Sequence, residues 1–196
     1  MNGSKHSPEI EKCKNLILFM DLQPRLLGTI KNEAYLMESN AILAKSANLL
    51  NIETIITEQV PEKLGVTHES IKKHLINPKI IIKETFSAFG VPEFSEMISD
   101  CGANRLILAG IETPICIFFT AVDALRKNID VTILSDCVGC RKPMDGNVCL
   151  THLIHSGVEV IPLESFLFRN LKSSIHSKFK EVSNLIRNRS VNVGNL

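Results

Sequence analysis

Six short apolar runs, each followed by a stretch of helical periodicity, constrain the fold of this chain more than any other feature of its sequence. The runs are nearly continuous in Val, Ile and Leu, which is typical of strands covered on both faces, since half-exposed strands alternate apolar and polar residues. The alternation of strand and helix predicts parallel strands joined by right-handed crossovers, and therefore a three-layer α/β/α fold around a six-stranded parallel sheet. The predicted strands are 15–21, 53–57, 79–83, 105–110, 130–136 and 157–162, and the predicted helices between them are 33–51, 67–76, 92–101, 114–128 and 143–156.

The length of 196 residues fits one domain of ordinary size, which we place at 12–170. A C-terminal segment, 171–196, follows it. This segment predicts an amphipathic helix over 177–188, because its apolar side chains recur at helical spacing: Phe179, Val182, Leu185 and Ile186.

Charge and composition limit the partners of the chain. Lys and Arg number 22 against 21 Asp and Glu, so the sequence carries no basic footprint for nucleic acid or an anionic membrane. No apolar run is long enough to span a bilayer, and the first residues lack the apolar core of a signal peptide. We expect a cytoplasmic protein with reduced cysteines and a small-molecule substrate.

Three chemically active side chains fall at one edge of the predicted sheet, because parallel strands present their carboxyl ends together. Asp21 ends the first strand, Lys83 ends the third, and Cys116 follows the fourth. With Thr113 as N-cap and Pro114 at the first helical position, Cys116 would lie at the third, where the helix dipole lowers the pKa of a thiol. Asp21 would accept the thiol proton and Lys83 would hold that carboxylate.

Each of these residues also has an ordinary structural explanation. Asp21 suits a turn, Lys83 suits a solvated strand end, and a free cysteine such as Cys116 is most often buried as a small apolar side chain. Their convergence at one edge favours catalysis.

Several motifs together resemble the isochorismatase-like, or cysteine hydrolase, superfamily over about 15–170. The motifs are "FMDLQ" at 19–23, "KETFSAF" at 83–89, "GIETPICIFFTAVDA" at 110–124 and "VTILSDCVGCR" at 131–141. Within the superfamily, "TEQVPEKLG" at 57–65 and "FKEVSNLIR" at 179–187 look most like the isochorismatase domain-containing proteins.

The resemblance implies a Rossmann-like strand order and a catalytic triad of Asp21, Lys83 and Cys116. It also implies a cis peptide bond between Ile111 and Glu112, and an oxyanion hole formed by the backbone N–H groups of Glu112 and Cys116. The implied reaction is hydrolysis of a small amide-type substrate, in which the Cys116 thiolate attacks the carbonyl carbon and water then cleaves the thioester.

Two differences between this chain and branches of the superfamily limit the reactions that the resemblance implies. The nicotinamidase branch carries an Asp-x-His metal motif at the end of its second strand, where this chain has Thr57, Glu58 and Gln59. His68 and His74 further on make a weak ligand set, so we predict no metal. The isochorismatases proper cleave a vinyl ether without a thiol nucleophile, so Cys116 favours acyl-type hydrolysis.

Two stretches that could suggest a dinucleotide site and a zinc site lack the residues or the spacing that such sites need. The turn "DLQPRLLG" at 21–28 has no glycine where a dinucleotide pyrophosphate would approach, so we predict no NAD and no other cofactor. "CVGC" at 137–140 with His152 and His155 has too short a histidine separation for a Cys2His2 zinc site.

The remaining predictions concern substrate contacts and assembly. Gln23, Phe86 and Phe89 follow the strand ends and are candidate substrate-binding residues. We expect a homo-oligomer, because the "FFTAVDAL" helix at 118–125 and the 179–187 tail offer more apolar surface than a small domain buries. A non-catalytic oligomeric binding module on the same fold, with Cys116 as a redox-sensing thiol, stays open as the alternative.

Overall fold

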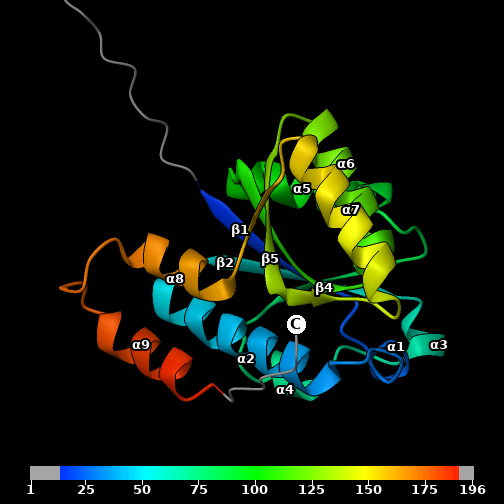
Figure 1. Ribbon diagram of the computed structural model, residues 1–196. Helices are drawn as coiled ribbons and strands as arrows, with labels where there is room; N and C mark the ends of the chain where they lie inside the picture. Colours follow the sequence, from blue (N-terminus) through cyan, green and yellow to red (C-terminus); the bar gives the residue numbers. More distant parts are fainter. Residues whose placement is uncertain (1–13, 190–196) are drawn as a thin grey trace, which may run out of the picture.

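The computed structural model describes residues 14–189 and contains one six-stranded parallel sheet in the order β3-β2-β1-β4-β5-β6 (Figure 1). This is the fold class that the sequence pattern predicted and the Rossmann-like order that the family resemblance implied. The predicted domain start at residue 12, and the tail beyond 189, lie outside the described residues. The strands are β1 (Asn15–Met20), β2 (Glu53–Gln59), β3 (Lys79–Lys83), β4 (Arg105–Ile111), β5 (Asp130–Gly139) and β6 (Glu159–Ile161).

Helices cover both faces of the sheet and bury a separate apolar cluster on each (Figure 1). One face is covered by α2 (Glu33–Leu50), α8 (Leu163–Leu171) and α9 (Phe179–Arg187). The other face is covered by α5 (Pro92–Cys101), α6 (Phe118–Arg126) and α7 (Pro143–His155). Three single-turn helices lie in the loops: α1 (Pro24–Leu27), α3 (Pro61–Leu64) and α4 (Glu69–Lys72).

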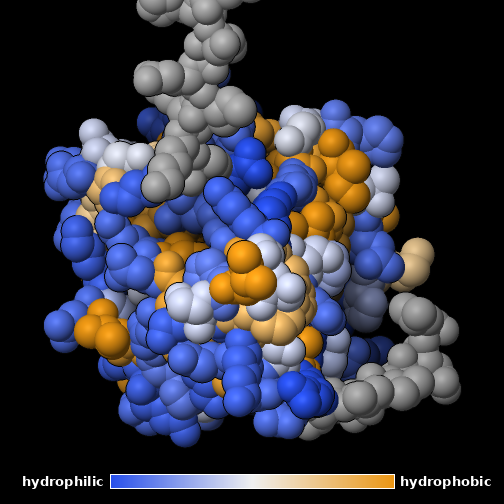
Figure 2. Space-filling view, turned by 90° about the vertical axis from the view of Figure 1, so that its left-hand side faces the viewer, coloured by the Kyte–Doolittle hydropathy of each residue, from blue (hydrophilic) through white to orange (hydrophobic). Residues whose placement is uncertain are grey.

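The predicted C-terminal helix is present as α9, and it packs on the domain itself. Val182 is fully buried in the same apolar cluster as α2 and α8, and Phe179, Leu185 and Ile186 pack against that cluster. Hydrophilic residues cover most of the face at the left of Figure 1, where α8 and α9 lie (Figure 2).

Two helix predictions differ from the structure. The helix predicted over 67–76 is reduced to α4, which is followed by turns. Only two apolar side chains of this stretch, Ile71 and Leu75, are buried, so a longer helix would have little apolar surface to pack. The helix α8 was not predicted at all, although Leu163, Phe166 and Leu167 are fully buried at helical spacing.

The carboxyl ends of β1 and β4 approach each other closely at Gly110. A Cβ atom at this position would lie 2.1 Å from the Met20 backbone oxygen, and the Gly110 φ of 115° is one that L side chains rarely adopt. Glycine therefore allows the end of β4 to lie against the end of β1. No helix in the described part of the chain is long and apolar enough to cross a membrane.

Candidate active site

Asp21, Lys83 and Cys116 meet beyond the carboxyl ends of β1, β3 and β4. Lys83 Nζ donates a hydrogen bond to Asp21 Oδ2 at 2.7 Å and lies 3.5 Å from Cys116 Sγ. All three residues are buried, with exposed fractions of 0 %, 1 % and 7 %. The long lysine stem spans the width of β2, which separates β3 from β1 in the sheet.

The Asp21 carboxylate has a donor on each oxygen. Thr57 Oγ1 donates to Oδ1 at 2.7 Å, and Lys83 occupies Oδ2. The Asp21 backbone has a φ of 53°, and its N–H donates to the Thr57 carbonyl at 3.1 Å. The end of β2 thus fixes both the backbone and the side chain of Asp21.

The turn that carries Cys116 is a π-helical turn, Thr113–Ile117, that leads into α6. Its signature is the hydrogen bond from the Ile117 N–H back to the Glu112 carbonyl, at 3.3 Å. The prediction of Thr113 as an N-cap, with Cys116 at the third helical position, is therefore wrong. Thr113 Oγ1 donates to the Gly139 carbonyl at 3.2 Å instead of capping the helix.

Burial raises the pKa of Cys116 to about 12, and the negative charge of Asp21 adds to the rise. The Lys83 ammonium lowers the pKa but does not offset the other two effects. We expected the helix dipole and Lys83 to bring this pKa below its ordinary value, and the net shift has the opposite direction. Burial and the Asp21 charge both favour the protonated thiol, and Lys83 Nζ lies within hydrogen-bond distance of its sulfur.

The peptide bond between Ile111 and Glu112 is cis, at the bond for which the family resemblance implied it. The Glu112 carboxylate accepts from Arg141 twice, from the side-chain Nε at 2.8 Å and from the backbone N–H at 3.1 Å. These contacts anchor the start of the Cys116 turn to the segment after β5.

The three predicted substrate contacts have different surroundings. Gln23 is fully buried, and its Nε2 donates to the carbonyls of Gln59 and Gly65; its role as a substrate contact stays a prediction. Phe89 packs edge-on against Phe94 of α5. Phe86 is 58 % exposed and stacks on another side chain, that of Phe119 in α6.

The end of β2 contributes more to this site than the sequence suggested. The sequence analysis used Thr57, Glu58 and Gln59 only to argue against a metal. In the structure Thr57 binds Asp21, Glu58 accepts from the Thr67 N–H at 2.8 Å, and Gln59 Oε1 accepts from Lys83 Nζ at 2.6 Å. Three consecutive polar residues at the end of a buried strand were the signal for this role.

No group of three or more His, Cys, Asp or Glu side chains within residues 14–189 is placed to hold a metal ion. His68 accepts from the Ser70 N–H and caps α4. Cys137 is fully buried, whereas Cys140 lines an open groove, so "CVGC" does not present a paired set of ligands.

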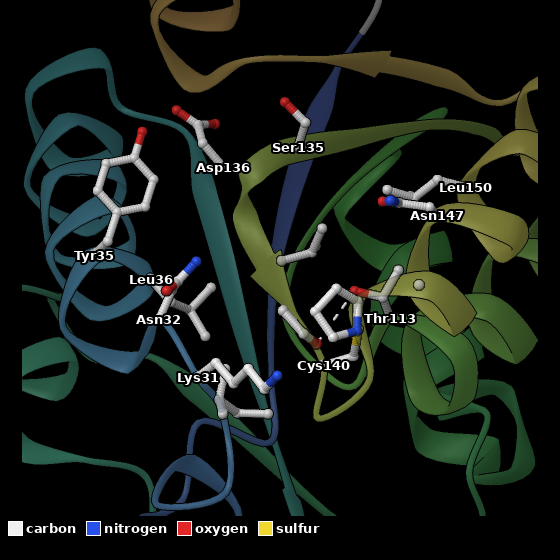
Figure 3. Close-up of a pocket in the computed structure, with 15 residues that line it drawn as sticks. Lys31, Asn32, Tyr35, Leu36, Thr113, Ser135, Asp136, Cys140, Asn147 and Leu150 are labelled. Carbon is white, nitrogen blue, oxygen red and sulfur yellow. Dashed lines mark hydrogen bonds between the residues drawn. The ribbon is translucent and has the colours of Figure 1, made fainter. Parts of the chain in front are cut away.

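That groove lies between α2 and α7, with a volume of about 240 Å³ (Figure 3). Lys31 and Tyr35 lie on one side of it and Asn147 on the other. It borders the π-helical turn at Thr113, but none of Asp21, Lys83 and Cys116 lines it. A second cavity, about 300 Å³, lies at the opposite edge of the sheet, beside the strand starts. None of Asp21, Lys83 and Cys116 lines either of these two cavities.

Residues 15–165 match the sequence model of the isochorismatase domain family. This chain belongs to the isochorismatase family. Isochorismatase domain-containing protein 2 of Danio rerio is 31 % identical over 180 residues, covering 92 % of this chain and 90 % of that protein. Isochorismatase domain-containing protein 1 of Danio rerio is 29 % identical over 168 residues, covering 85 % of this chain and 59 % of that protein. The chain thus spans less than two thirds of that relative.

Solved structures show the same fold. The structure of MAR1 ribonuclease from Caenorhabditis elegans superposes with a TM-score of 0.87 at 28 % identity, covering 93 % of this chain and 94 % of that one. The YcaC gene product of Escherichia coli, described as an octameric hydrolase of unknown specificity, superposes with a TM-score of 0.74 at 19 % identity, covering 92 % and 97 %. These structures show that the chain has the fold of its family.

Proposed function

We propose that this protein is a metal-independent cysteine hydrolase that cleaves the C–N bond of a small amide-type substrate. The observation that carries the proposal is the buried cluster in which Lys83 Nζ bonds Asp21 at 2.7 Å and lies 3.5 Å from the Cys116 sulfur. A carboxylate, a fixed cation and a thiol within hydrogen-bond reach are the parts that nucleophilic acyl transfer requires.

The raised pKa of Cys116 makes Asp21 the general base. The thiol proton passes to the Asp21 carboxylate as the sulfur forms a bond to the substrate carbonyl carbon, and the carbonyl π electrons move to oxygen. The backbone N–H groups of Glu112 and Cys116 are the proposed donors to that oxyanion. Lys83 holds Asp21 in place during the transfer.

The tetrahedral intermediate collapses with cleavage of the C–N bond, and the protonated Asp21 gives its proton to the leaving amine. A thioester on Cys116 remains. Water then attacks the thioester carbon while Asp21 takes a proton from it. Cleavage of the C–S bond releases a carboxylic acid, and the Cys116 sulfur regains a proton from Asp21.

A panel of small primary and secondary amides tests the proposal, with product analysis and intact-protein mass spectrometry to detect the thioester. We expect turnover and an acyl adduct on Cys116, both lost in Cys116→Ala and both kept in the control Cys140→Ala. RNA belongs in the same panel because of the Caenorhabditis elegans neighbour. RNA cleavage with no amide turnover, or amide turnover retained by Cys116→Ala, would overturn the proposal.

The alternative, in which Cys116 is a redox-sensing thiol, is weakened by the raised pKa of that thiol. Oxidants react with the thiolate, and a thiol whose pKa is about 12 is almost entirely protonated at neutral pH. A cytoplasmic location and a small-molecule substrate remain part of the proposal.

We also expect self-association. The apolar face of α9 is used within the domain, so the surface available for it lies elsewhere, at Phe86 and Phe119, which are 58 % and 45 % exposed and stacked on each other. Light scattering at micromolar concentration should give a multiple of the chain mass, and Phe119→Asp should reduce it. A monomeric mass for the unaltered protein would contradict this expectation.

A further inference from the structure

The Lys83 ammonium has more acceptors around it than hydrogens to donate. Asp21 Oδ2 lies at 2.7 Å from Nζ, Gln59 Oε1 at 2.6 Å, the Thr85 carbonyl at 3.3 Å and Cys116 Sγ at 3.5 Å. An ammonium group carries three hydrogens. The two shortest contacts go to Asp21 and Gln59, so the thiol sulfur must share what remains with the Thr85 carbonyl.

Gln59 is held so that its side-chain oxygen points at Lys83. Its Nε2 donates to the Glu84 carbonyl at 2.8 Å, which assigns the other end of the carboxamide, Oε1, to the ammonium. Its backbone is clamped by Gln23, whose Oε1 accepts the Gln59 N–H at 2.8 Å and whose Nε2 donates to the Gln59 carbonyl at 3.0 Å. The buried Gln23 thus acts on the site through Gln59.

From this geometry we infer that Gln59 is a positioning residue that competes with the Cys116 sulfur for the Lys83 ammonium and thereby lowers the reactivity of the resting thiol. The inference rests on the proposed function, because it concerns the same thiol. It assigns Gln59 no contact with substrate. The competition works through one hydrogen bond, since a neutral carboxamide brings no charge of its own.

The charged groups that act on Cys116 are few. Asp21, at the end of β1, raises the pKa of the thiol, and Lys83, at the end of β3, lowers it. Removing the Gln59 acceptor would free one ammonium hydrogen for the sulfur, and a hydrogen bond to the charged form of a group favours that form. A carboxylate at position 59 would do the opposite, because it binds Lys83 more strongly and adds a negative charge near the sulfur.

Two substitutions with opposite expected effects test the inference. Gln59→Met keeps the length of the side chain without the acceptor, and Gln59→Glu keeps the acceptor and adds charge. The measurement is the rate at which iodoacetamide alkylates Cys116 in the folded protein as a function of pH, followed by peptide mass mapping. A fall of one unit in the thiol pKa would raise the thiolate fraction about tenfold and lower its nucleophilicity, for a net gain of about threefold.

We expect Gln59→Met to label about threefold faster than the unaltered protein and Gln59→Glu to label more slowly. General loosening of the site would speed labelling in both variants, which would overturn the inference. Equal rates in all three proteins would also overturn it, as would an unlabelled Cys116 in Gln59→Met under conditions that fully label Cys140. Gln59→Asn, whose carboxamide is one methylene shorter, should behave like Gln59→Met and replaces it if that variant does not fold.

The labelling experiment on Gln59 can fail or succeed independently of the activity test of the proposed function. Labelling reports the ionisation of Cys116 whether or not an amide is hydrolysed, whereas the acyl adduct and its loss in Cys116→Ala report catalysis. Equal labelling rates together with an acyl adduct would reject the role of Gln59 alone.

Discussion

At the end of β1, Asp21 pairs with Lys83 beside the thiol of Cys116, and within β5 Asp136 pairs with Arg189 next to Cys137. Both ion pairs are 2.7 Å long, and both thiols are buried. The composition of the two clusters is the same: one carboxylate, one cation and one cysteine.

The contacts of the second cluster are structural. Arg189 lies over the Tyr35 ring at 4.4 Å, and Asp136 Oδ1 accepts the Leu163 N–H at 2.7 Å, so the pair ties α2 and α8 to β5. Cys137 is the next residue along the strand and packs in the apolar cluster under α2. Asp136 and Cys137 thus both contact the helices that cover this face of the sheet, and the groups of the second cluster hold those helices to β5.

The comparison teaches that the origin of the side chains in the chain, and not their composition, makes the first cluster a candidate site. Its three side chains come from three different segments and converge on one point, whereas the second cluster takes its acid and its thiol from adjacent positions.

The largest expected effect is a difference in the rate of amide hydrolysis between variants of Lys83 and of Arg189. Lys83→Met should lower amide hydrolysis by about a hundredfold or more, because Asp21 loses the group that positions it as a base. Arg189→Met should leave the rate within a few-fold of the unaltered protein. Steady-state kinetics on the best amide of the panel provides the measurement, and equal losses in the two variants would remove the distinction between the clusters.

The next effect concerns stability. Lys83→Met leaves the Asp21 carboxylate buried without its cation, which costs about 3–5 kcal/mol in the free energy of unfolding. Combining it with Asp21→Asn removes that charge, so the double variant should unfold at higher denaturant than Lys83→Met while staying inactive. Urea unfolding of the unaltered protein, both single variants and the double variant gives a double-mutant cycle. Strictly additive losses in the free energy of unfolding would argue against a direct Asp21–Lys83 interaction.

A smaller effect is expected from pH. The folded protein raises the pKa of Cys116 from 9.0 to about 12, so it holds this proton more tightly than the unfolded chain does. The stability contributed by Cys116 is therefore fully present below pH 9.0 and is lost as the pH rises toward 12. Urea unfolding at several pH values in this window should show a shallower decline for Cys116→Ala than for the unaltered protein. A parallel decline would mean that the folded protein does not raise this pKa.

The smallest expected effect is that of a chelator. Since Thr57, Glu58 and Gln59 bind Asp21, Thr67 and Lys83 in the structure, EDTA should leave hydrolysis unchanged. Loss of activity on chelation, restored by zinc or manganese, would contradict a metal-independent mechanism.

The sequence pattern by itself was enough to predict the parallel sheet and the edge where the candidate site lies, whereas the order of the strands came from the family resemblance. Continuous apolar runs identify buried parallel strands, and the carboxyl ends of such strands share one edge, so Asp21, Lys83 and Cys116 could be grouped without coordinates. Secondary structure was predicted less well where few residues carry the signal, as in α8 and the single turn α4.

Only the tertiary structure decided the state of the thiol and the role of Gln59. The pKa of Cys116 depends on how much water its neighbours exclude and on the placement of one anion and one cation, and these come from three segments distant in sequence. Gln59 binds Lys83 because β2 lies between β1 and β3 and because Gln23 fixes its backbone. A hydrogen bond depends on tenths of an ångström and on angles, which residue types and spacings along a chain do not specify.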